Sequence, residues 1–322
     1  MQVSRGGTMK AVILGGTGAI GAATALRLLG AGWSVDVTGR DPSAMPPELV
    51  NVGGRFHPID RSDASAVGGL AADDTDLLVD LLAFSGPDVR ALLPVMGAVG
   101  RTVLMSGRAV YTDPFGRHIN SDEAPVFPVP IPEDNPTLDP AADDIDPFTR
   151  EGYAPGKVAV EREALASGLE VTIIRPSKVH GPFARNARTR SVVERMTSGA
   201  AVIDIADGGR SIDHLTAAAN AAALVETAAA GGLPGVVNGA DPDPLTALEI
   251  FETIADVAGW TGELRPIVDD GDEERGHHPW RSRNPIVLDM TRAIAAGYEP
   301  AGTGRALLAD EVEWVLRSQG GR

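Results

Sequence analysis

The stretch Gly15-Gly16-Thr17-Gly18-Ala19-Ile20-Gly21 decides the fold. It directly follows an apolar run, Lys10–Leu14, and opens a predicted helix, Ile20–Gly30. Gly15 permits a tight turn, Gly18 lets the backbone approach a pyrophosphate, and Gly21 allows close packing of helix on strand. A helix N-terminus also presents free N–H groups and a positive dipole end to phosphates. The context of strand, turn and helix therefore predicts a dinucleotide-binding turn made of Gly15, Thr17, Gly18, Ala19, Ile20 and Gly21.

The first half of the chain alternates short apolar runs with helical stretches. This pattern predicts an α/β fold with a Rossmann-type, doubly wound parallel sheet. Such a sheet binds ligands at the carboxyl ends of its strands. The predicted strands are Lys10–Leu14, Ser34–Thr38, Arg55–Ile59, Leu77–Leu82, Thr102–Met105 and Glu170–Arg175. The predicted helices are Ile20–Gly30, Ala64–Ala71, Asp88–Met96 and Pro155–Ser167.

The second half is organised differently. Thr112–Phe148 carries eight of the 24 prolines, which predicts a long irregular loop. After Pro176, short helix and strand candidates indicate a smaller C-terminal α/β substrate lobe. We predict a Rossmann domain over residues 9–176, joined by roughly 211–240, and a substrate lobe over 177–210 and 241–322.

Composition excludes several function classes. The formal net charge is −16, from 28 basic and 44 acidic residues, and a field of that sign repels nucleic acid and anionic lipid. The absence of cysteine excludes disulfides, thiolate nucleophiles and Cys-ligated zinc. No run of eighteen apolar residues exists, and residues 1–10 lack the apolar stretch of a signal peptide. We expect a cytoplasmic protein with a small-molecule substrate and no metal, and a homodimer is left open.

The ends of the second and third predicted strands bear on cofactor choice. An acidic residue after the second strand holds the ribose hydroxyls of NAD, but Gly39 stands there, followed by Arg40. The absence of an acid at position 39, together with the guanidinium of Arg40, favours the 2′-phosphate of NADP. Asp41 is the complication, because it either neutralises Arg40 or caps a turn. Asp60 and Arg61 close the third strand, where a side chain meets the adenine. For Asp60, a role as a turn cap is the alternative.

Tyr153 and Lys157 are the second strong feature. Spaced four apart, they project from one helix face, and Pro155 predicts that this helix begins nearby. The Lys157 ammonium is expected to lower the pKa of Tyr153 and make it an acid or base near neutrality. With three Tyr and three Lys in the chain, chance predicts about 0.03 such pairs. Glu161 on the same face is expected to pair with Lys157.

Together these motifs resemble the short-chain dehydrogenase/reductase superfamily, in its extended or atypical branch, the NAD-dependent epimerase/dehydratase family. Arg175-Pro176 and His180-Gly181-Pro182 add to the resemblance. It implies Tyr153 as the catalytic acid/base and Lys157 as both its pKa tuner and a ribose ligand. It also implies cofactor contacts at Ala83 and Pro176.

The chain departs from this family at the third catalytic position. The family has Ser or Thr four residues before a Tyr; here that Tyr is Tyr111, which puts Gly107 on the catalytic position. The neighbouring Ser106 is the replacement we favour, and Arg108 is the alternative electrophile. Arg108, Tyr111 and His180 are our candidate substrate contacts, with structural pairing or loop roles as their alternatives. The stretch Asp80-Leu81-Leu82-Ala83-Phe84 after the fourth strand also departs from the family, which usually has a small-residue turn there lining the cofactor.

The resulting hypothesis is an NADP-preferring oxidoreductase or epimerase, with NAD as the other cofactor considered. It transfers hydride at a hydroxyl or carbonyl carbon of a small molecule, with nucleotide sugars among the candidates. The alternative is a non-catalytic NADP-binding sensor or nucleotide-binding module.

Overall fold

The computed structural model describes residues 7–72, 74–268 and 274–320. Residues 1–6, which belong to the segment predicted not to be a signal peptide, lie outside the described residues. The chain forms two compact units. Unit 1 comprises Met1–Ser106, Asp139–Ile174 and Ala222–Val236, and unit 2 comprises Gly107–Leu138, Arg175–Ala221 and Val237–Arg322. Among the described residues, no helix is long and apolar enough to cross a membrane.

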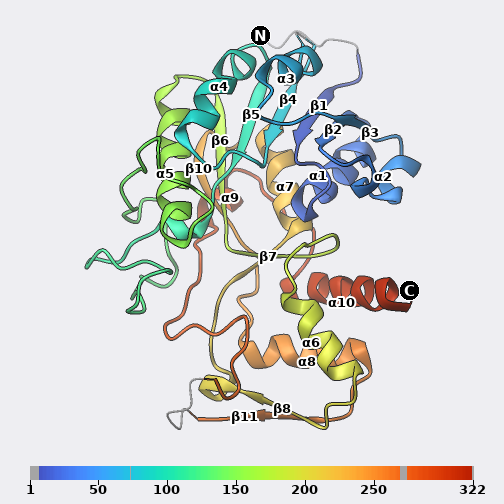
Figure 1. The fold of residues 1–322 in the computed structure, drawn as a ribbon, viewed down its shortest axis with the longest axis vertical. Coiled ribbons are helices and arrows are strands. Elements are labelled where there is room, and N and C mark those ends of the chain that lie inside the picture. The colour runs from blue at the N-terminus through green and yellow to red at the C-terminus, as the bar shows by residue number, and fades with distance from the viewer. Residues whose placement is uncertain (1–6, 73, 269–273, 321–322) are drawn as a thin grey trace. The chain divides into compact units, whose positions relative to one another are not determined.

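A twisted sheet forms the centre of unit 1 (Figure 1). Its seven strands follow the order β10-β6-β5-β4-β1-β2-β3, so the order reverses between β1 and β4. The pairs joining β3 through β6 are all parallel. This confirms the predicted Rossmann-type α/β class, in which the reversal marks the ligand crevice. The strands are β1 (Lys10–Leu14), β2 (Ser34–Gly39), β3 (Arg55–Pro58), β4 (Leu77–Asp80), β5 (Arg101–Met105), β6 (Val171–Pro176) and β10 (Gly235–Gly239).

Helices cover both faces of this sheet (Figure 1). One face packs against α3, α4 and α5 through a core that includes Leu14, Leu78, Leu92 and Val160. The other face carries α1 and α7, which Arg27 joins through an ion pair of 2.6 Å with Glu226. The helices are α1 (Ala19–Gly30), α2 (Pro47–Asn51), α3 (Ala64–Leu70), α4 (Gly86–Met96), α5 (Arg150–Ala166) and α7 (Ala218–Ala229), with the 3₁₀ turn η1 (Pro42–Ala44).

The start of α5 differs from its prediction. We expected the helix to begin near Pro155, but it begins at Arg150 and holds Pro155 in its second turn. The Thr149 hydroxyl caps it by accepting from the Gly152 N–H at 2.9 Å. Because Pro155 has no N–H, only the carbonyl of Glu151 loses its partner, and Glu151 is exposed to water. As predicted, residues 112–148 form no helix or extended strand.

Unit 2 has a core of its own. Ile203, Ile250, Phe251, Trp280 and Leu308 are among its buried side chains. Two small parallel sheets pair β7 with β9 and β8 with β11. The elements are η2 (Arg108–Val110), β7 (Lys178–His180), α6 (Arg188–Thr197), β8 (Val202–Ile205), η3 (Ala206–Gly209), β9 (Leu215–Ala217), α8 (Ala247–Ala258), β11 (Glu263–Pro266), α9 (Thr291–Ala295) and α10 (Gly304–Gly320).

The two units divide the chain differently from the predicted domains. Residues 107–138, 175–176, 211–221 and 237–240 fall in unit 2, whereas we placed them with the Rossmann domain. The reason is local bonding. Ile131 exchanges backbone hydrogen bonds with Val287 and Asp289 of unit 2. Within residues 211–221, β9 pairs with β7.

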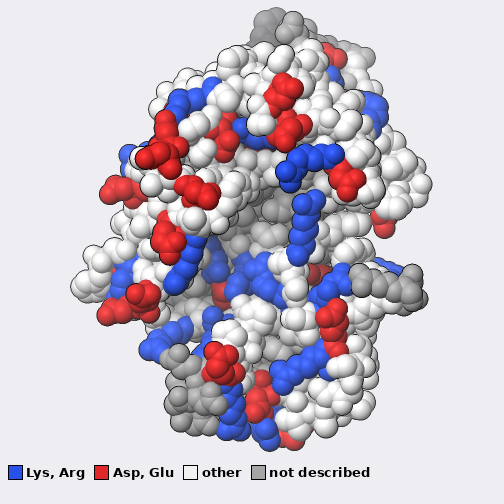
Figure 2. Space-filling model, in the orientation of Figure 1, with Lys and Arg blue, Asp and Glu red and all other residues white. Residues whose placement is uncertain are grey.

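On the face drawn in Figure 2, basic and acidic side chains are interspersed. The net charge of −16 therefore does not gather into a single acidic patch there. The expectation that nucleic acid is repelled rests on net charge alone.

Candidate active site

The glycine-rich turn links β1 to α1. Gly15 has a φ of +86°, which glycine adopts without strain. A Cβ on Gly21 would lie 2.4 Å from the Gly15 carbonyl oxygen, so only glycine lets the helix start this close to the strand. A Cβ on Gly18 would have its nearest atom at 3.9 Å, so the space beside Gly18 is open. Gly18 caps α1 without a side-chain bond, which leaves backbone N–H groups at the helix start available for an anion.

Lys157 is buried at the carboxyl ends of two neighbouring strands. The residue is 2% exposed, and its Nζ donates to the carbonyl oxygens of Ala83 at 2.7 Å and Met105 at 2.9 Å. These residues follow β4 and end β5. Burial lowers the pKa of Lys157 to about 8, and the charge of Asp80 opposes that shift.

A chain of contacts joins the glycine-rich turn to Lys157. A Cβ on Gly15 would lie 3.0 Å from Leu82 Cγ, so the turn lies directly beside the segment that follows β4. The next residue along that segment, Ala83, accepts the hydrogen bond from Lys157. Unit 1 therefore holds the predicted cofactor turn and the predicted Tyr153–Lys157 pair at one end of its sheet.

The pKa of Tyr153 contradicts our expectation. Burial raises it above its ordinary value, whereas we expected the Lys157 ammonium to lower it. The ammonium lies 6.0 Å from the Tyr153 ring centroid and is directed to two backbone carbonyls. Desolvation is therefore the cause of the raised pKa, and it favours the neutral phenol over the phenolate.

Ser106 directs its hydroxyl into the protein. Its Oγ donates to Glu161 Oε1 at 2.5 Å, and both side chains are buried. A hydroxyl has a single proton, so this bond occupies the only donor that Ser106 has. Glu161, which we expected to pair with Lys157, thus receives the Ser106 hydroxyl one helical turn further along α5. Sequence reasoning missed this pair because residues 55 apart carry no local signal.

The end of β2 resolves the role of Asp41. Its carboxylate accepts from Ser43 N at 2.9 Å and Ser43 Oγ at 2.7 Å, so it caps η1. Arg40 is exposed and makes no hydrogen bond or ion pair with any described residue. A Cβ on Gly39 would lie 3.1 Å from the Phe56 ring, so an acidic residue fits poorly there.

Asp60 and Arg61 have structural partners. Asp60 accepts from Ser62 N at 2.9 Å and Ser62 Oγ at 2.7 Å, which is the turn-cap role considered above. Arg61 is 7% exposed and donates from Nη2 to Asp80 Oδ2 at 2.6 Å and to the Asp88 carbonyl at 2.9 Å. A buried ion pair therefore holds the Arg61 guanidinium, and its contact with the adenine stays a prediction.

The predicted substrate contacts lie in unit 2, as does Pro176 at the end of β6. The Arg108 guanidinium forms a buried ion pair with Asp213, which also receives Lys178 Nζ at 2.5 Å. The Tyr111 side chain is fully buried, and its hydroxyl donates to Asn238 Oδ1 at 2.6 Å. Tyr111 is therefore a core residue in this structure, which agrees with the structural role considered as its alternative, and its contact with substrate stays a prediction.

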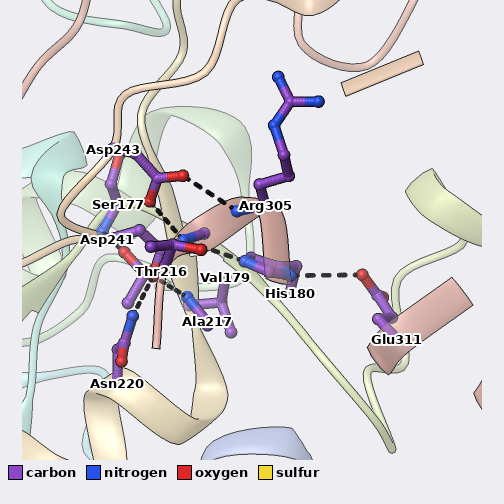
Figure 3. A network of polar contacts seen from close by, with 12 residues as sticks. Ser177, Val179, His180, Thr216, Ala217, Asn220, Asp241, Asp243, Arg305 and Glu311 are labelled. Carbon is purple, nitrogen blue, oxygen red and sulfur yellow. Dashed lines mark hydrogen bonds and ion pairs between the residues drawn. The ribbon is translucent and has the colours of Figure 1, made fainter. Parts of the chain in front are cut away.

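His180 is held between two carboxylates (Figure 3). Its Nε2 lies 3.0 Å from Asp241 Oδ2, and its Nδ1 lies 3.5 Å from Glu311 Oε2. Burial alone would lower the pKa of His180, but the contacts with Asp241 and Glu311 outweigh it and raise the pKa to about 9. This buried ion network joins β7 to α10 and has no exposed face for substrate.

The His180 network makes the stability of the protein pH-dependent. The charged His180 ring contributes to the free energy of unfolding. This contribution is complete below the ordinary histidine pKa of about 6.5 and is lost as pH rises through about 9. We expect a loss of about 3 kcal/mol across that window. Urea unfolding at pH 6 and pH 9.5 measures it. In His180→Gln, the free energy of unfolding should depend much less on pH. The control His277→Gln replaces an exposed histidine and should keep the wild-type dependence. The same pH dependence in His180→Gln and wild type contradicts this assignment.

Two of the remaining histidines, His214 and His278, are buried in unit 2. Burial lowers the pKa of His278 to about 4, and its ring packs edge-on against Phe251 at 5.7 Å. His214 accepts from the Leu288 N–H and donates to the Asp241 carbonyl. Across residues 7–72, 74–268 and 274–320, no group of three or more His, Asp or Glu side chains is arranged to hold a metal ion.

Comparison with known proteins identifies the family. Residues 11–238 match the NAD dependent epimerase/dehydratase family. The chain belongs to the NAD-dependent epimerase/dehydratase family. This match confirms the resemblance seen in the sequence. It spans the glycine-rich turn and the Tyr153–Lys157 pair.

Solved structures of epimerases and dehydratases share this fold. UDP-glucose 4-epimerase from Thermotoga maritima is 20% identical, with a TM-score of 0.69, covering 97% of this chain and 100% of that one. UDP-N-acetylglucosamine 4-epimerase from Methanobrevibacter ruminantium is 17% identical, with a TM-score of 0.70 and coverages of 97% and 99%. dTDP-glucose 4,6-dehydratase from Bacillus anthracis, in complex with NAD, is 15% identical, with a TM-score of 0.70 and coverages of 97% and 98%. A search of curated proteins gives no match.

Proposed function

We propose that this member of the epimerase/dehydratase family is an NADP-preferring oxidoreductase or epimerase that transfers hydride at a hydroxyl or carbonyl carbon of a small molecule. The observation that carries the proposal is the contact chain from Gly15 through Leu82 and Ala83 to Lys157. It brings a phosphate-binding turn and a Tyr–Lys pair to one end of the sheet. Nucleotide sugars are the substrate class we favour, because the similar structures include complexes with UDP-glucose and UDP-N-acetylmuramic acid.

The residues present fit a dinucleotide. The open space beside Gly18 and the uncapped start of α1 suit a pyrophosphate. Lys157 is the expected ribose ligand. The nicotinamide, when bound, supplies or takes up the hydride.

Tyr153 handles the proton at the substrate oxygen. Its raised pKa keeps the phenol neutral near pH 7, so it donates a proton in the direction of reduction. Lys157, with a pKa of about 8, keeps its positive charge below that pH and favours developing negative charge nearby. Activity that needs this ammonium therefore declines as pH rises above about 8.

Both candidate donors for stabilising an oxyanion on the substrate are bonded to carboxylates of the protein. The Ser106 proton is engaged by Glu161, and Asp213 holds the Arg108 guanidinium. Ser106 therefore has to release Glu161 before it can donate to substrate. Gly107 has an extended backbone with a φ of 179°, which any residue adopts, so backbone strain does not explain the glycine. Gly107→Ser is accordingly compatible with the backbone and would restore the family hydroxyl.

The lack of a free oxyanion donor at Ser106 and Arg108 supports the second candidate function, a non-catalytic NADP-binding module. Consumption of NADPH with a panel of carbonyl compounds and nucleotide-sugar ketones distinguishes the two. Turnover supports the enzyme. Saturable NADPH binding without turnover on any member of the panel supports the module.

Arg40 is the residue we assign to the 2′-phosphate. Arg40→Ala is expected to weaken NADPH binding by about 1.5–3 kcal/mol, the range for hydrogen bonds to charged groups. NADH lacks the 2′-phosphate and serves as the internal control, so its affinity should change little. Calorimetric titration of both cofactors measures the difference, and equal losses for NADPH and NADH would remove Arg40 from cofactor selection.

A further inference from the structure

The Phe84 side chain lies against the Lys157 ammonium. Its ring centroid is 4.0 Å from Lys157 Nζ, well within the distance for a cation–π interaction. Lys157 has three N–H donors, and two of them go to the carbonyl oxygens of Ala83 and Met105. The Phe84 ring contacts the same nitrogen from another direction. Two backbone carbonyls and one aromatic face therefore surround the Lys157 ammonium, which is almost completely buried from water.

The same ring also packs against Tyr153. The Phe84 and Tyr153 ring centroids are 6.3 Å apart, and on another side the Phe148 ring lies 5.2 Å from Phe84. Phe148 is 76% exposed, whereas Phe84 is largely covered. Phe84 therefore contacts both members of the Tyr–Lys pair, and Phe148 contacts Phe84 from the solvent side.

Glycine at position 156 fixes this arrangement through the backbone. A Cβ on Gly156 would lie 2.5 Å from the Phe84 carbonyl oxygen, closer than real Cβ atoms approach. Gly156 stands between Tyr153 and Lys157 in α5. The helix segment that carries the pair is thus in direct backbone contact with Phe84, independently of the ring contacts.

We propose that Phe84 is a positioning residue, whose ring holds the Lys157 ammonium and the Tyr153 phenol in place for proton transfer. The proposal rests on the proposed function, because it takes Tyr153 and Lys157 as the proton-transfer pair. Phe84 touches the pair and acts through it. The ring attracts the charged form of Lys157 and excludes water, whereas an aliphatic side chain of similar bulk would only exclude water.

Titration of Lys157 tests this proposal without substrate or cofactor. The chain has three lysines, so ¹⁵N-lysine labelling gives a simple NMR spectrum in which Lys157→Met identifies the Lys157 signal. Phe84→Leu keeps apolar bulk but removes the aromatic face. It is expected to lower the pKa of Lys157 by about one unit. Phe84→Tyr and Phe84→Trp should keep the wild-type value.

Phe148→Leu is the matched control, because the Phe148 ring packs on Phe84 and its loss leaves the Phe84–Lys157 contact in place. An unchanged pKa of Lys157 in Phe84→Leu overturns the proposal, as does an equal shift in Phe148→Leu. If melting shows that Phe84→Leu does not fold, Phe84→Met provides a flexible apolar replacement for the same titration. If the protein is active, the apparent pKa of the alkaline limb of the pH–rate profile should fall in Phe84→Leu by the same amount as the pKa of Lys157. The titration needs no turnover. Failure of this proposal can therefore be distinguished from failure of the proposed function.

Discussion

Tyr153→Phe is expected to lower turnover by about 100-fold or more, because it removes the proton donor and leaves the ring. The Tyr153 ring packs on Phe84 at 6.3 Å, and this contact survives in the variant. Cofactor affinity and melting temperature should therefore stay close to wild type. Steady-state rates with NADPH, cofactor titration and thermal melting measure the three quantities.

Tyr298→Phe is the matched control, since it deletes the hydroxyl of a buried tyrosine in unit 2. Its turnover should remain near the wild-type rate. Comparable turnover in Tyr153→Phe and wild type would exclude Tyr153 from the mechanism. A joint loss of turnover and cofactor affinity would make Tyr153 a structural residue of the site.

Gly21→Ala is expected to destabilise the protein by about 3 kcal/mol, at the upper end for forced overpacking. The added methyl would lie 2.4 Å from the Gly15 carbonyl oxygen and 2.6 Å from Gly16 Cα. These are backbone atoms of the turn itself, so relief requires the turn to deform. Cofactor binding should be lost together with stability, which denaturant unfolding and titration measure.

Gly30→Ala is the control at the other end of α1. A Cβ there meets nothing within 4 Å, and alanine is the better helix former. This variant should unfold at the same denaturant concentration as wild type or a slightly higher one. If Gly21→Ala behaves like Gly30→Ala, the close approach of helix and turn does not constrain this fold.

Apolar runs and glycine-rich turns in the sequence predicted most of the strands and helices of unit 1. The run Lys10–Leu14 matches β1 at both ends, and the glycine-rich turn lies directly after it. Strand continuity and turn chemistry act over a few residues, so the sequence shows them. The start of α5 was mispredicted because the cap at Thr149 outweighs the cost of Pro155 in the second turn.

The site was predictable only where its residues are neighbours in the sequence. Tyr153 and Lys157 stand four apart, and their common helix face follows from spacing. The pKa of Tyr153 depends on how deeply the fold buries it, which no spacing reveals. The partners of Arg61 and Ser106 lie 19 and 55 residues away, so their buried bonds to Asp80 and Glu161 appear only in the folded chain.

Every chemical step proposed above depends on a nicotinamide cofactor held by the glycine-rich turn, and one calorimetric titration tests this directly. NADPH and NADH are titrated into the wild-type protein and into Gly18→Ala, whose added methyl meets no atom closer than 3.9 Å. We predict saturable binding to wild type, tighter for NADPH, and at least about tenfold weaker binding to Gly18→Ala at an unchanged melting temperature, because the methyl occupies the approach of the pyrophosphate. Equal affinity in the two proteins, or no binding of either cofactor to wild type, would contradict the account.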